Sequence, residues 1–460
     1  MSPPDLADLT ITEAGRRLRD GTLTAAGLME AHIARVRARD PVLRAFVARD
    51  DEHAMAAAAA ADAALAQGED RGPLHGIPVG LKDLIDTRDL PTRYGSNAVA
   101  ADHRPAADAL VARRLEAAGA VLAGKLATYE FALVGPSRDG PNPPATNPWS
   151  ALHITGGSSS GCAAAVGGGL LRTSLGTDTG GSVRSPAGYC GVVGLKPTFG
   201  RVPTDGIHPL SPRLDHVGPL SATVAEAALT FDAVADPAPG IATAASGLGS
   251  PDLAGLRVGY LRAWAATDPL ADGRVIAAAD DAASHLSLLG ARIIEASLPA
   301  YPLFEACGAV VLHWEALRHH EAALRQHGAR YGRLAFNSLL AGLCLEEADL
   351  DRALRTAGSL RRAVDGALKD CDALLTVTTL APAPPFTAFD GERPVWTPMR
   401  TIPFNVTGHP VLAMPAGFAG GLPVGIQLVG RAMAEEILCR IGDAYERTTG
   451  HGALRPPSFP

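Results

Sequence analysis

The chain has 460 residues, of which 47% are hydrophobic, so it is long enough to bury a large core. Its 41 lysines and arginines against 48 aspartates and glutamates give a net charge of −7, a modest acidic balance that offers no electrostatic footprint for nucleic acid. No apolar run approaches the roughly 18 residues of a membrane span, and the N-terminus lacks the basic and apolar regions of a signal peptide. Six scattered cysteines suit a reducing compartment. We therefore expect a cytoplasmic protein without nucleic-acid or membrane partners.

Helical and strand-like segments alternate along the chain, which predicts an α/β architecture with several parallel strands. Helices are predicted over residues 9–39 (two helices, broken at 21–24), 50–67, 111–119, 162–170, 223–235, 272–289 and 435–448. Buried strands are predicted over a segment ending near residue 82 and over residues 120–125, 256–261, 373–378, 411–415 and 424–430.

The segments between these elements differ in composition. Residues 301–369 are strongly helical and carry most of the late aromatic residues, so we expect a variable helical cap at about 300–370. Residues 137–150, 203–219 and 381–398 are rich in proline and predict loops. The low-complexity residues 237–251 are a candidate boundary.

Two clusters of glycine and serine or threonine lie at residues 156–161 and 177–182, with an apolar segment between them. Glycine permits positive φ and the close approach of another group. A serine set among glycines can therefore meet a substrate while nearby N–H groups point at one spot, as acyl transfer requires. The alternative is that each cluster is only a tightly packed loop. That alternative would suffice for a single cluster and is weaker for two.

A nucleophilic serine at position 182 needs a base. The nearest histidines, His153 and His208, lie in proline-rich loops without informative spacing. Residues 157–161 fit G-x-S-x-G, but no predicted strand leads into them, which disfavours an α/β-hydrolase triad. Lys82 ends an apolar strand, where burial would ease loss of its proton. Taken alone, Lys82 is better explained as a structural or solvated residue, although its place after a buried strand sets it above the other lysines.

Two other patterns predict no site. Residues 119–125 match G-x-x-x-x-G-K, but Leu126 stands where a P-loop needs serine or threonine, so nucleotide binding is not expected. His319 and His320 are adjacent and point to different faces of a helix, so with Glu315 they do not predict a metal site.

Several motifs together resemble the amidase signature family. They are GPLHGIPVGLKDLID, GGSSSG and GTDTGGSVRSPAGYCGVVGLKPTFGRV, with weaker matches at DALLTVTT, FNVTGHPVLAMPAGF and GLPVGIQLVG, and they span about residues 72–430. The serine spacing, 182 − 158 = 24, agrees with the family pattern. The resemblance implies one domain over 1–460: a mixed, twisted β-sheet flanked by helices on both faces, with a catalytic core at 70–220 and a helical cap.

The resemblance also implies a Ser–cis-Ser–Lys triad without metal or cofactor. Ser182 would form the acyl-enzyme, Ser158 on a cis peptide would relay the proton, and a neutral Lys82 would be the base. The oxyanion hole would be formed by the N–H groups of Thr179, Gly180, Gly181 and Ser182. The supporting residues would be Ser159, Asp178 and Arg184, of which Arg184 could instead face the substrate.

Substrate preference is expected to lie in the cap and in the loop at 201–213. The predicted pocket wall is apolar and consists of Phe304, Leu312, Trp314, Tyr331, Phe336 and Leu340. Arg201 and Arg213 are candidate substrate contacts, with solvated loop residues as the alternative. This composition favours aryl or alkyl amides, esters and carbamates (urethanes), cleaved by a monomer or homodimer.

Three other functions stay open at this stage. One is the catalytic A-type subunit of a tRNA-dependent amidotransferase, which would need partner subunits. Another is a biuret- or allophanate-type hydrolase. A non-catalytic relative is the third, although Lys82, Ser158 and Ser182 are all present.

Overall fold

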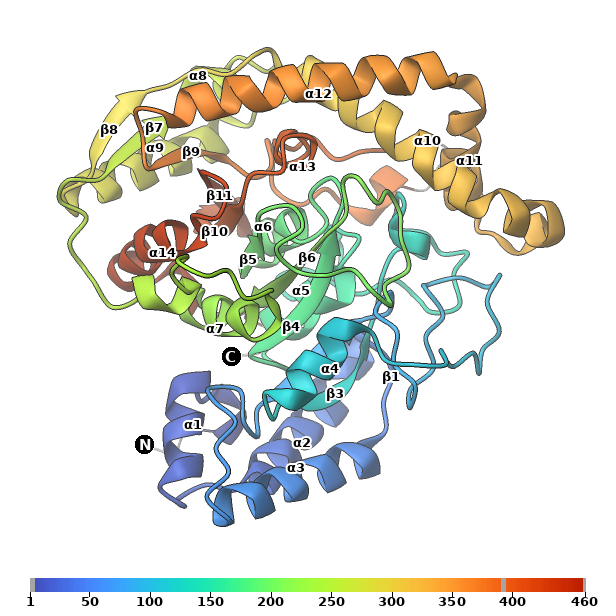
Figure 1. Cartoon of the computed structure of the whole chain (residues 1–460), viewed down its shortest axis with the longest axis vertical. Helices are drawn as coiled ribbons and strands as arrows, with labels where there is room; N and C mark the ends of the chain where they lie inside the picture. Colours follow the sequence, from blue (N-terminus) through green and yellow to red (C-terminus); the bar gives the residue numbers. More distant parts are fainter. Residues whose placement is uncertain (1–4, 390–393, 458–460) are drawn as a thin grey trace.

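A single mixed β-sheet of eleven strands runs through the computed structural model, which describes residues 5–389 and 394–457 (Figure 1). The strands are β1 (Phe46–Ala48), β2 (Pro78–Lys82), β3 (Val121–Leu126), β4 (Thr173–Asp178), β5 (Val193–Lys196), β6 (His216–Ser221), β7 (Arg257–Tyr260), β8 (Arg292–Glu295), β9 (Ala373–Val377), β10 (Val411–Ala419) and β11 (Leu422–Gly430). Their spatial order is β1-β3-β2-β4-β6-β5-β10-β11-β9-β7-β8.

The sheet combines two parallel regions joined by an antiparallel centre. Strand β2 pairs in parallel with β3 and β4, and β7 pairs in parallel with β8 and β9. Between them, β4, β6, β5, β10, β11 and β9 pair antiparallel in succession. The sequence predicted a mixed sheet in an α/β fold, and the structure confirms it, but the strand order was not predictable from the pattern of elements.

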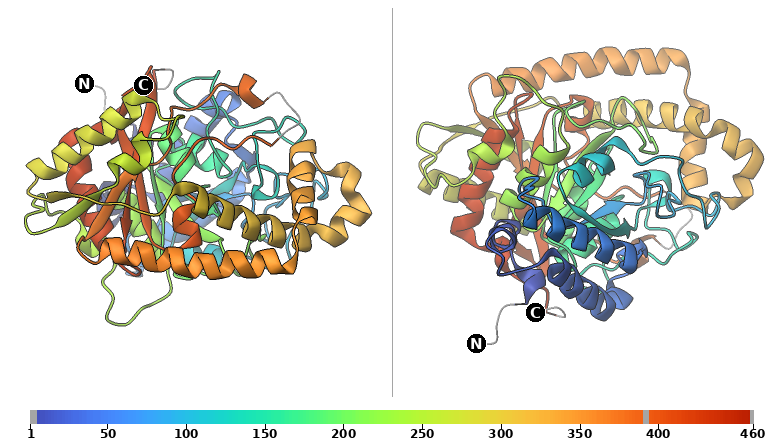
Figure 2. Two further views of the ribbon diagram at one scale, coloured as in Figure 1. Left: turned by 90° about the horizontal axis from the view of Figure 1, so that it is seen from above. Right: turned by 60° about the horizontal axis from the view of Figure 1, so that its bottom comes forward.

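Helices cover both faces of this sheet (Figures 1 and 2). The helices are α1 (Ile11–Arg19), α2 (Ala25–Leu43), α3 (Asp51–Ala66), α4 (Leu110–Ala117), α5 (Ser160–Gly167), α6 (Arg184–Cys190), α7 (Val224–Val234), α8 (Arg262–Ala266), α9 (Gly273–Leu288), α10 (Tyr301–His327), α11 (Arg333–Leu340), α12 (Glu347–Leu368), α13 (Pro403–Val406) and α14 (Glu435–Thr449). Helices α7, α9 and α14 pack together against the central strands, and α5 and α6 pack against the strands that carry the site.

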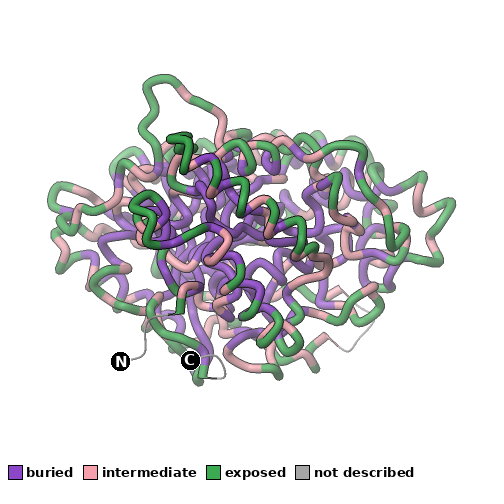
Figure 3. The backbone as a smooth tube through the Cα atoms, turned by 90° about the horizontal axis from the view of Figure 1, so that it is seen from below, coloured by how far each residue is buried: buried purple, intermediate pink, exposed green. Residues whose placement is uncertain are grey.

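The centre of the sheet is almost wholly buried, as Figure 3 shows. Every residue of β2, β4, β5, β6 and β9 is buried. Strands covered on both faces lose the alternation that marks a half-exposed strand. Strands β2 and β9 were still recognisable as apolar runs, whereas β4 (TSLGTD) is mostly polar although buried and was not predicted. No helix among residues 5–389 and 394–457 is both long and apolar enough to cross a bilayer.

Helices α10, α11 and α12 form the cap, which lies along one edge of the molecule (Figures 1 and 2). Helix α12 begins at a capping box, in which the Glu346 and Asp349 side chains bind each other's backbone N–H groups. Helix α10 packs on α12 and also on α13, which belongs to the core. The predicted cap is therefore present, and α10 connects it to the core.

Two predictions from loop composition are wrong. Strand β6 begins within residues 203–219, and its Gly218 lies so close to the neighbouring strand that a Cβ there would collide with the Leu195 carbonyl oxygen, so the strand demands glycine. Residues 237–251 do not separate domains, because the strands before and after them belong to one sheet.

Close packing around α5 gives a stability prediction. A Cβ on Gly161 would collide with the Ala127 backbone nitrogen and would lie 2.5 Å from the Ala45 carbonyl oxygen. Gly161→Ala should therefore force backbone to move and lower the free energy of unfolding by roughly 1–3 kcal/mol or more. Gly358→Ala on α12, whose nearest neighbour is a flexible arginine atom at 3.8 Å, should stabilise by about 0.5–1 kcal/mol. Chemical denaturation of both variants checks this, and equal stabilities would contradict it.

Candidate active site

Lys82 is the last residue of β2 and lies inside the protein, because β2 is flanked by β3 and β4 and is buried along its whole length. Its Nζ lies 2.8 Å from Ser158 Oγ and 2.7 Å from Thr177 Oγ1. Desolvation lowers the pKa of Lys82 from its ordinary value of 10.5 to about 7. A lysine with this pKa is partly neutral near pH 7, so its amine can accept a proton from Ser158.

Ser158 lies just before α5, and the Gly157–Ser158 peptide bond is cis. The aromatic ring of Tyr129 packs directly on Gly157, where a Cβ would collide with it. Glycine is therefore required at position 157 for the ring and the peptide to meet. Ser158 itself is 1% exposed and borders a cavity.

Ser182 lies in the turn between β4 and α6 and borders the same cavity as Ser158. The Ser159 N–H donates to the Ser182 carbonyl oxygen at 3.2 Å, which ties the two glycine-rich segments together. The three predicted triad members thus come together from β2, from the start of α5 and from the turn before α6. Ser158 Oγ contacts the Lys82 amine directly, and Ser182 borders the same cavity as Ser158.

The turn from Thr179 to Ser182 borders the cavity along its whole length. The N–H groups of Thr179, Gly180 and Ser182 have no acceptor among the described residues. The N–H of Gly181, in contrast, donates to Asp178 Oδ1 at 2.8 Å. The Gly181 N–H thus closes the turn, and the oxyanion hole stays a prediction to which the other three N–H groups are better suited.

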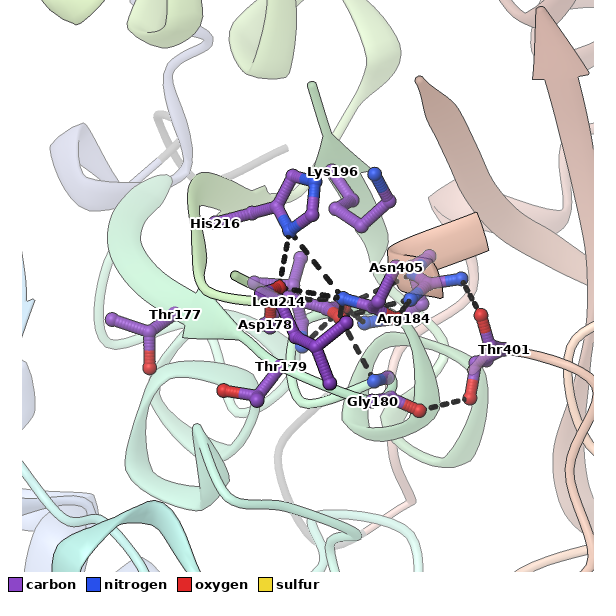
Figure 4. Close-up of polar contacts among 12 residues, drawn as sticks. Thr177, Asp178, Thr179, Gly180, Arg184, Lys196, Leu214, His216, Thr401 and Asn405 are labelled. Atoms are coloured by element: carbon purple, nitrogen blue, oxygen red, sulfur yellow. Dashed lines mark hydrogen bonds and ion pairs between the residues drawn. The ribbon is translucent and has the colours of Figure 1, made fainter. Parts of the chain in front are cut away.

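Asp178 and Arg184 form a fully buried ion pair behind this turn (Figure 4). Arg184 Nη2 and Nε donate to the two carboxylate oxygens at 2.8 and 3.0 Å. Burial alone would raise the pKa of Asp178, but the Arg184 charge and the hydrogen bonds from Arg184 and Asn405 outweigh it and hold that pKa far below its usual range. Arg184 points away from the cavity into this network, which is the position of a structural residue.

Ser159 supports the lysine indirectly. Its Oγ donates to the Thr177 carbonyl oxygen at 3.1 Å and accepts from the Thr177 N–H at 3.3 Å. Thr177 in turn places its hydroxyl beside Lys82. Thr177 was not predicted, although it opens the second glycine cluster; the missing signal was that its side chain faces β2 across the sheet.

Two further residues that sequence reasoning missed come from the segment before β10. Thr401 Oγ1 donates to the Gly180 carbonyl oxygen at 2.6 Å. Asn405 Nδ2 donates to Asp178 Oδ1 at 2.8 Å, and its Oδ1 accepts from Arg184 at 2.6 Å (Figure 4). Both lie more than 200 positions beyond the glycine clusters, so no local pattern in the sequence could connect them to the site.

The cavity in front of the two serines has an apolar wall. Its described lining residues are Tyr129, Ala132, Leu133, Val134, Gly135, Ile154, Gly156, Gly157, Ser158, Thr179, Gly180, Gly181, Ser182, Ser185, Leu210, Leu312, Val395, Trp396, Thr397 and Met399. None of these carries a charged side chain. The lining residues lie in several loops and, in the case of Leu312, in the cap.

Most of the predicted wall lies elsewhere. Only Leu312 of the six predicted residues borders the cavity. Phe304 is fully buried in the core of the cap, because its helix face packs on Trp264 and Leu261. Tyr331 and Phe336 line a separate open cleft near the tip of the cap. Trp314 and Leu340 are not among the described lining residues; the guanidinium of Arg318 stacks on the Trp314 ring.

The two candidate arginines also have other partners. Arg213 forms an ion pair with Glu315 of α10. The Arg201 guanidinium lies over the Phe231 ring, 5.9 Å from its centroid. Neither is among the described residues that line the cavity. The solvated or structural alternative therefore fits both better than substrate contact.

The two patterns set aside in the sequence have structural roles. Lys125 is buried and its Nζ donates to Thr92 Oγ1 at 2.7 Å and to the Ile85 carbonyl oxygen. His320 packs against Phe131, with ring centroids 4.5 Å apart. The described residues contain no group of three or more metal-binding side chains placed to hold an ion.

The Asp178–Arg184 pair gives a testable prediction. Arg184→Met should leave the Asp178 carboxylate buried without its counter-ion and destabilise the protein by about 3–5 kcal/mol. Arg274→Met removes a partner of Asp272 from an exposed ion pair and should hardly change the unfolding midpoint. Urea denaturation compares the two, and equal midpoint shifts would show that the buried pair has no special structural role.

The sequence profile of the Amidase family matches residues 27–439. Among curated proteins, a glutamyl-tRNA(Gln) amidotransferase subunit of Chloroflexus aurantiacus is 37% identical and covers 98% of this chain and 99% of its own length. The corresponding amidotransferase subunit of Anaeromyxobacter sp. is also 37% identical, over 98% of each chain.

Solved structures show the same relationship. The native peptide amidase of Stenotrophomonas maltophilia superimposes with a TM-score of 0.86 at 31% identity, over 99% of this chain and 100% of the other. A bacterial aryl acylamidase shares the fold, with a TM-score of 0.87 at 22% identity over 97% of this chain and 99% of the other. The resemblance inferred from the motifs is confirmed, and the chain belongs to the Amidase family, the amidase signature enzymes.

Proposed function

We propose that the protein hydrolyses uncharged amides, and by extension aryl esters and carbamates, through an acyl-enzyme on Ser182. Membership of the amidase family makes it a C–N hydrolase. The observation that carries the finer proposal is the absence of any charged side chain from the described wall of the cavity. Burying an ionised group there without a partner would be costly, so the wall favours neutral substrates.

The chemistry follows from the order of the side chains. Ser182 Oγ attacks the carbonyl carbon while its proton passes to Ser158 Oγ, and Ser158 gives its own proton to Lys82 Nζ, 2.8 Å away. The N–H groups of Gly180 and Ser182, with that of Thr179, would stabilise the oxyanion. The relay then returns a proton to the leaving nitrogen, and a water molecule hydrolyses the ester of Ser182 by the same steps.

Glutamine-dependent transamidation is the second candidate, supported by the names of relatives that are 37% identical over nearly the whole chain. Free glutamine brings an ammonium and a carboxylate into the site. Arg184, a buried cation directly after the turn, donates to both carboxylate oxygens of Asp178. The described cavity wall thus offers glutamine no counter-ion, whereas Leu312, Val395 and Trp396 suit an aryl or alkyl group.

A substrate panel tests the proposal. The purified chain, without partners, is assayed on an acyl anilide, an alkyl amide, an aryl ester, a carbamate, biuret and L-glutamine, with kcat/KM as the readout. We expect the anilide or alkyl amide to exceed glutamine and biuret by at least about 100-fold, because the wall offers apolar contact and no ion pair. Ser182→Ala should lose more than about 1,000-fold on every substrate. Preferred turnover of glutamine would support transamidation instead, and activity without Ser182 would refute the acyl-enzyme.

The protonation state of Lys82 gives a pH prediction. Because burial lowers its pKa to about 7, Lys82 is protonated below that pH and cannot accept the proton of Ser158. We expect kcat/KM to fall about tenfold per pH unit below pH 7 and to level off above it. Lys82→Ala should lose this limb along with most activity. A profile flat between pH 5 and 8 would exclude Lys82 as the base.

A further inference from the structure

The turn that carries Ser182 is fixed at three points. The Gly181 N–H is held by Asp178, and the Gly180 carbonyl oxygen accepts from Thr401 Oγ1 at 2.6 Å. The third point is the side chain of Thr179, whose Oγ1 donates to Asp215 Oδ1 at 2.6 Å. Asp178 and Thr401 belong to the core around the sheet, while Asp215 lies in the loop that leads into β6. The Thr179 contact is therefore made by a loop, whereas the other two contacts are made by the core.

Asp215 closes its own loop and is fixed by it. Its Oδ2 accepts from the N–H groups of Leu210 and Ser211 at 2.9 and 3.0 Å. Burial raises the pKa of this carboxyl to about 6, while the hydrogen bond from Thr179 and the two N–H groups oppose the rise. Leu210, one of these two residues, also borders the cavity. The loop thus contacts both the substrate space and the turn.

The cap holds this loop through Glu315 of α10. Ser211 Oγ donates to Glu315 Oε2 at 2.6 Å, and the Arg213 N–H donates to the same oxygen at 3.2 Å. Ser211 is fully buried and Glu315 is 8% exposed, so these contacts are shielded from water. One turn earlier on α10, Leu312 borders the cavity. The same helix therefore forms part of the substrate wall and anchors the loop that holds Thr179.

We propose that Asp215 is a positioning residue that fixes Thr179 at the oxyanion turn, and that Glu315 connects this contact to the cap. The inference rests on the proposed acyl transfer at Ser182. Anchoring the Thr179 side chain fixes the peptide that carries the Gly180 N–H, one of the three N–H groups of the turn without an acceptor among the described residues. A misplaced donor stabilises the developing oxyanion poorly while leaving the bound ground state almost unchanged.

The test compares a ligand that forms the oxyanion with one that does not. An aldehyde adds to Ser182 Oγ: its carbonyl carbon gains the C–O bond, the carbonyl oxygen takes the negative charge, and the serine proton passes to Ser158. The alcohol of the same carbon skeleton binds without this step. Both are measured as competitive inhibitors of the best panel substrate, with the wild type, Thr179→Val, Thr179→Ser and Asp215→Asn.

We expect Thr179→Val, which replaces the hydroxyl with a methyl group of similar size, to lose about ten- to a hundredfold in both kcat/KM and aldehyde affinity. Affinity for the alcohol should change by less than about twofold, and Thr179→Ser should restore most of the loss because it keeps the hydroxyl. Asp215→Asn has only one acceptor oxygen, so it cannot accept from Thr179 and from the Leu210 and Ser211 N–H groups at once. It should lose aldehyde affinity in the same direction as Thr179→Val, and the double variant should lose less than the sum of the two single losses. Ser211→Ala, which cuts the link to Glu315, should lose in the same direction to a smaller extent.

Several outcomes would overturn the inference. Equal losses for aldehyde and alcohol in Thr179→Val would indicate a general packing role, and unchanged affinities would mean that the contact does not position the turn. Full activity in Ser211→Ala would refute the connection to the cap.

The proposed function and the inference can fail separately. If the wild type shows no Ser182-dependent hydrolysis, both fail. If the wild type is active and Thr179→Val is equally active, the inference alone fails. Should Thr179→Val not fold, the comparison of Thr179→Ser with Asp215→Asn decides.

Discussion

The buried carboxylate of Asp178 is the constraint on which the site depends. It stands at the end of β4 and binds the Gly181 and Val183 N–H groups, the guanidinium of Arg184 and the amide of Asn405. One charged group therefore joins the strand, the turn and α6, and through Asn405 it also reaches the segment before β10. A carboxylate without these donors would be too costly to bury in the centre of the sheet. The hydrogen bonds that satisfy the Asp178 carboxylate thus also fix the conformation of the turn that carries Ser182.

Lys82 is also a buried ionisable group, but unlike Asp178 it is not held in its charged form. Among the described residues its amine forms no ion pair, and desolvation outweighs the charges of Asp178 and Asp215, which oppose it, and brings its pKa to about 7. The hydroxyls of Ser158 and Thr177 provide the neutral hydrogen-bond partners that an uncharged amine needs. Two buried groups of the same site are thus kept in different states. The carboxylate of Asp178 is ionised because Arg184 compensates its charge, and Lys82 can be neutral because the cost of desolvation exceeds the attraction of the nearby carboxylates.

The sequence predicted the parts of the site whose chemistry is local. Glycine-rich clusters around Ser158 and Ser182 and a lysine ending an apolar strand marked the residues, and the family resemblance combined them into a predicted triad. It also predicted the α/β class and the cap. The apolar wall was largely misplaced, because side chains such as Phe304 and Tyr331 are equally apolar in a helix core and in a pocket. Contacts from Thr401 and Asn405 depend on which distant strands become neighbours, and periodicity does not encode strand order.

The residues that hold the catalytic turn and the residues that line the cavity lie in different segments of the chain. Proteins with one fold can therefore act on different substrates. Lys82 and Asp178 end strands of the sheet, and Ser158, Ser182 and Arg184 lie where α5 and α6 begin, whereas the wall combines Leu312 of the cap with Leu210 and Trp396 of separate loops. Changes in those segments can alter the substrate without disturbing the charges that hold the turn. The chain is 37% identical to amidotransferase subunits and 31% identical to a peptide amidase. A shared fold of this kind does not fix the substrate. The charge of the wall is the more direct guide, because an ionised substrate must find its counter-ion there or remain in water.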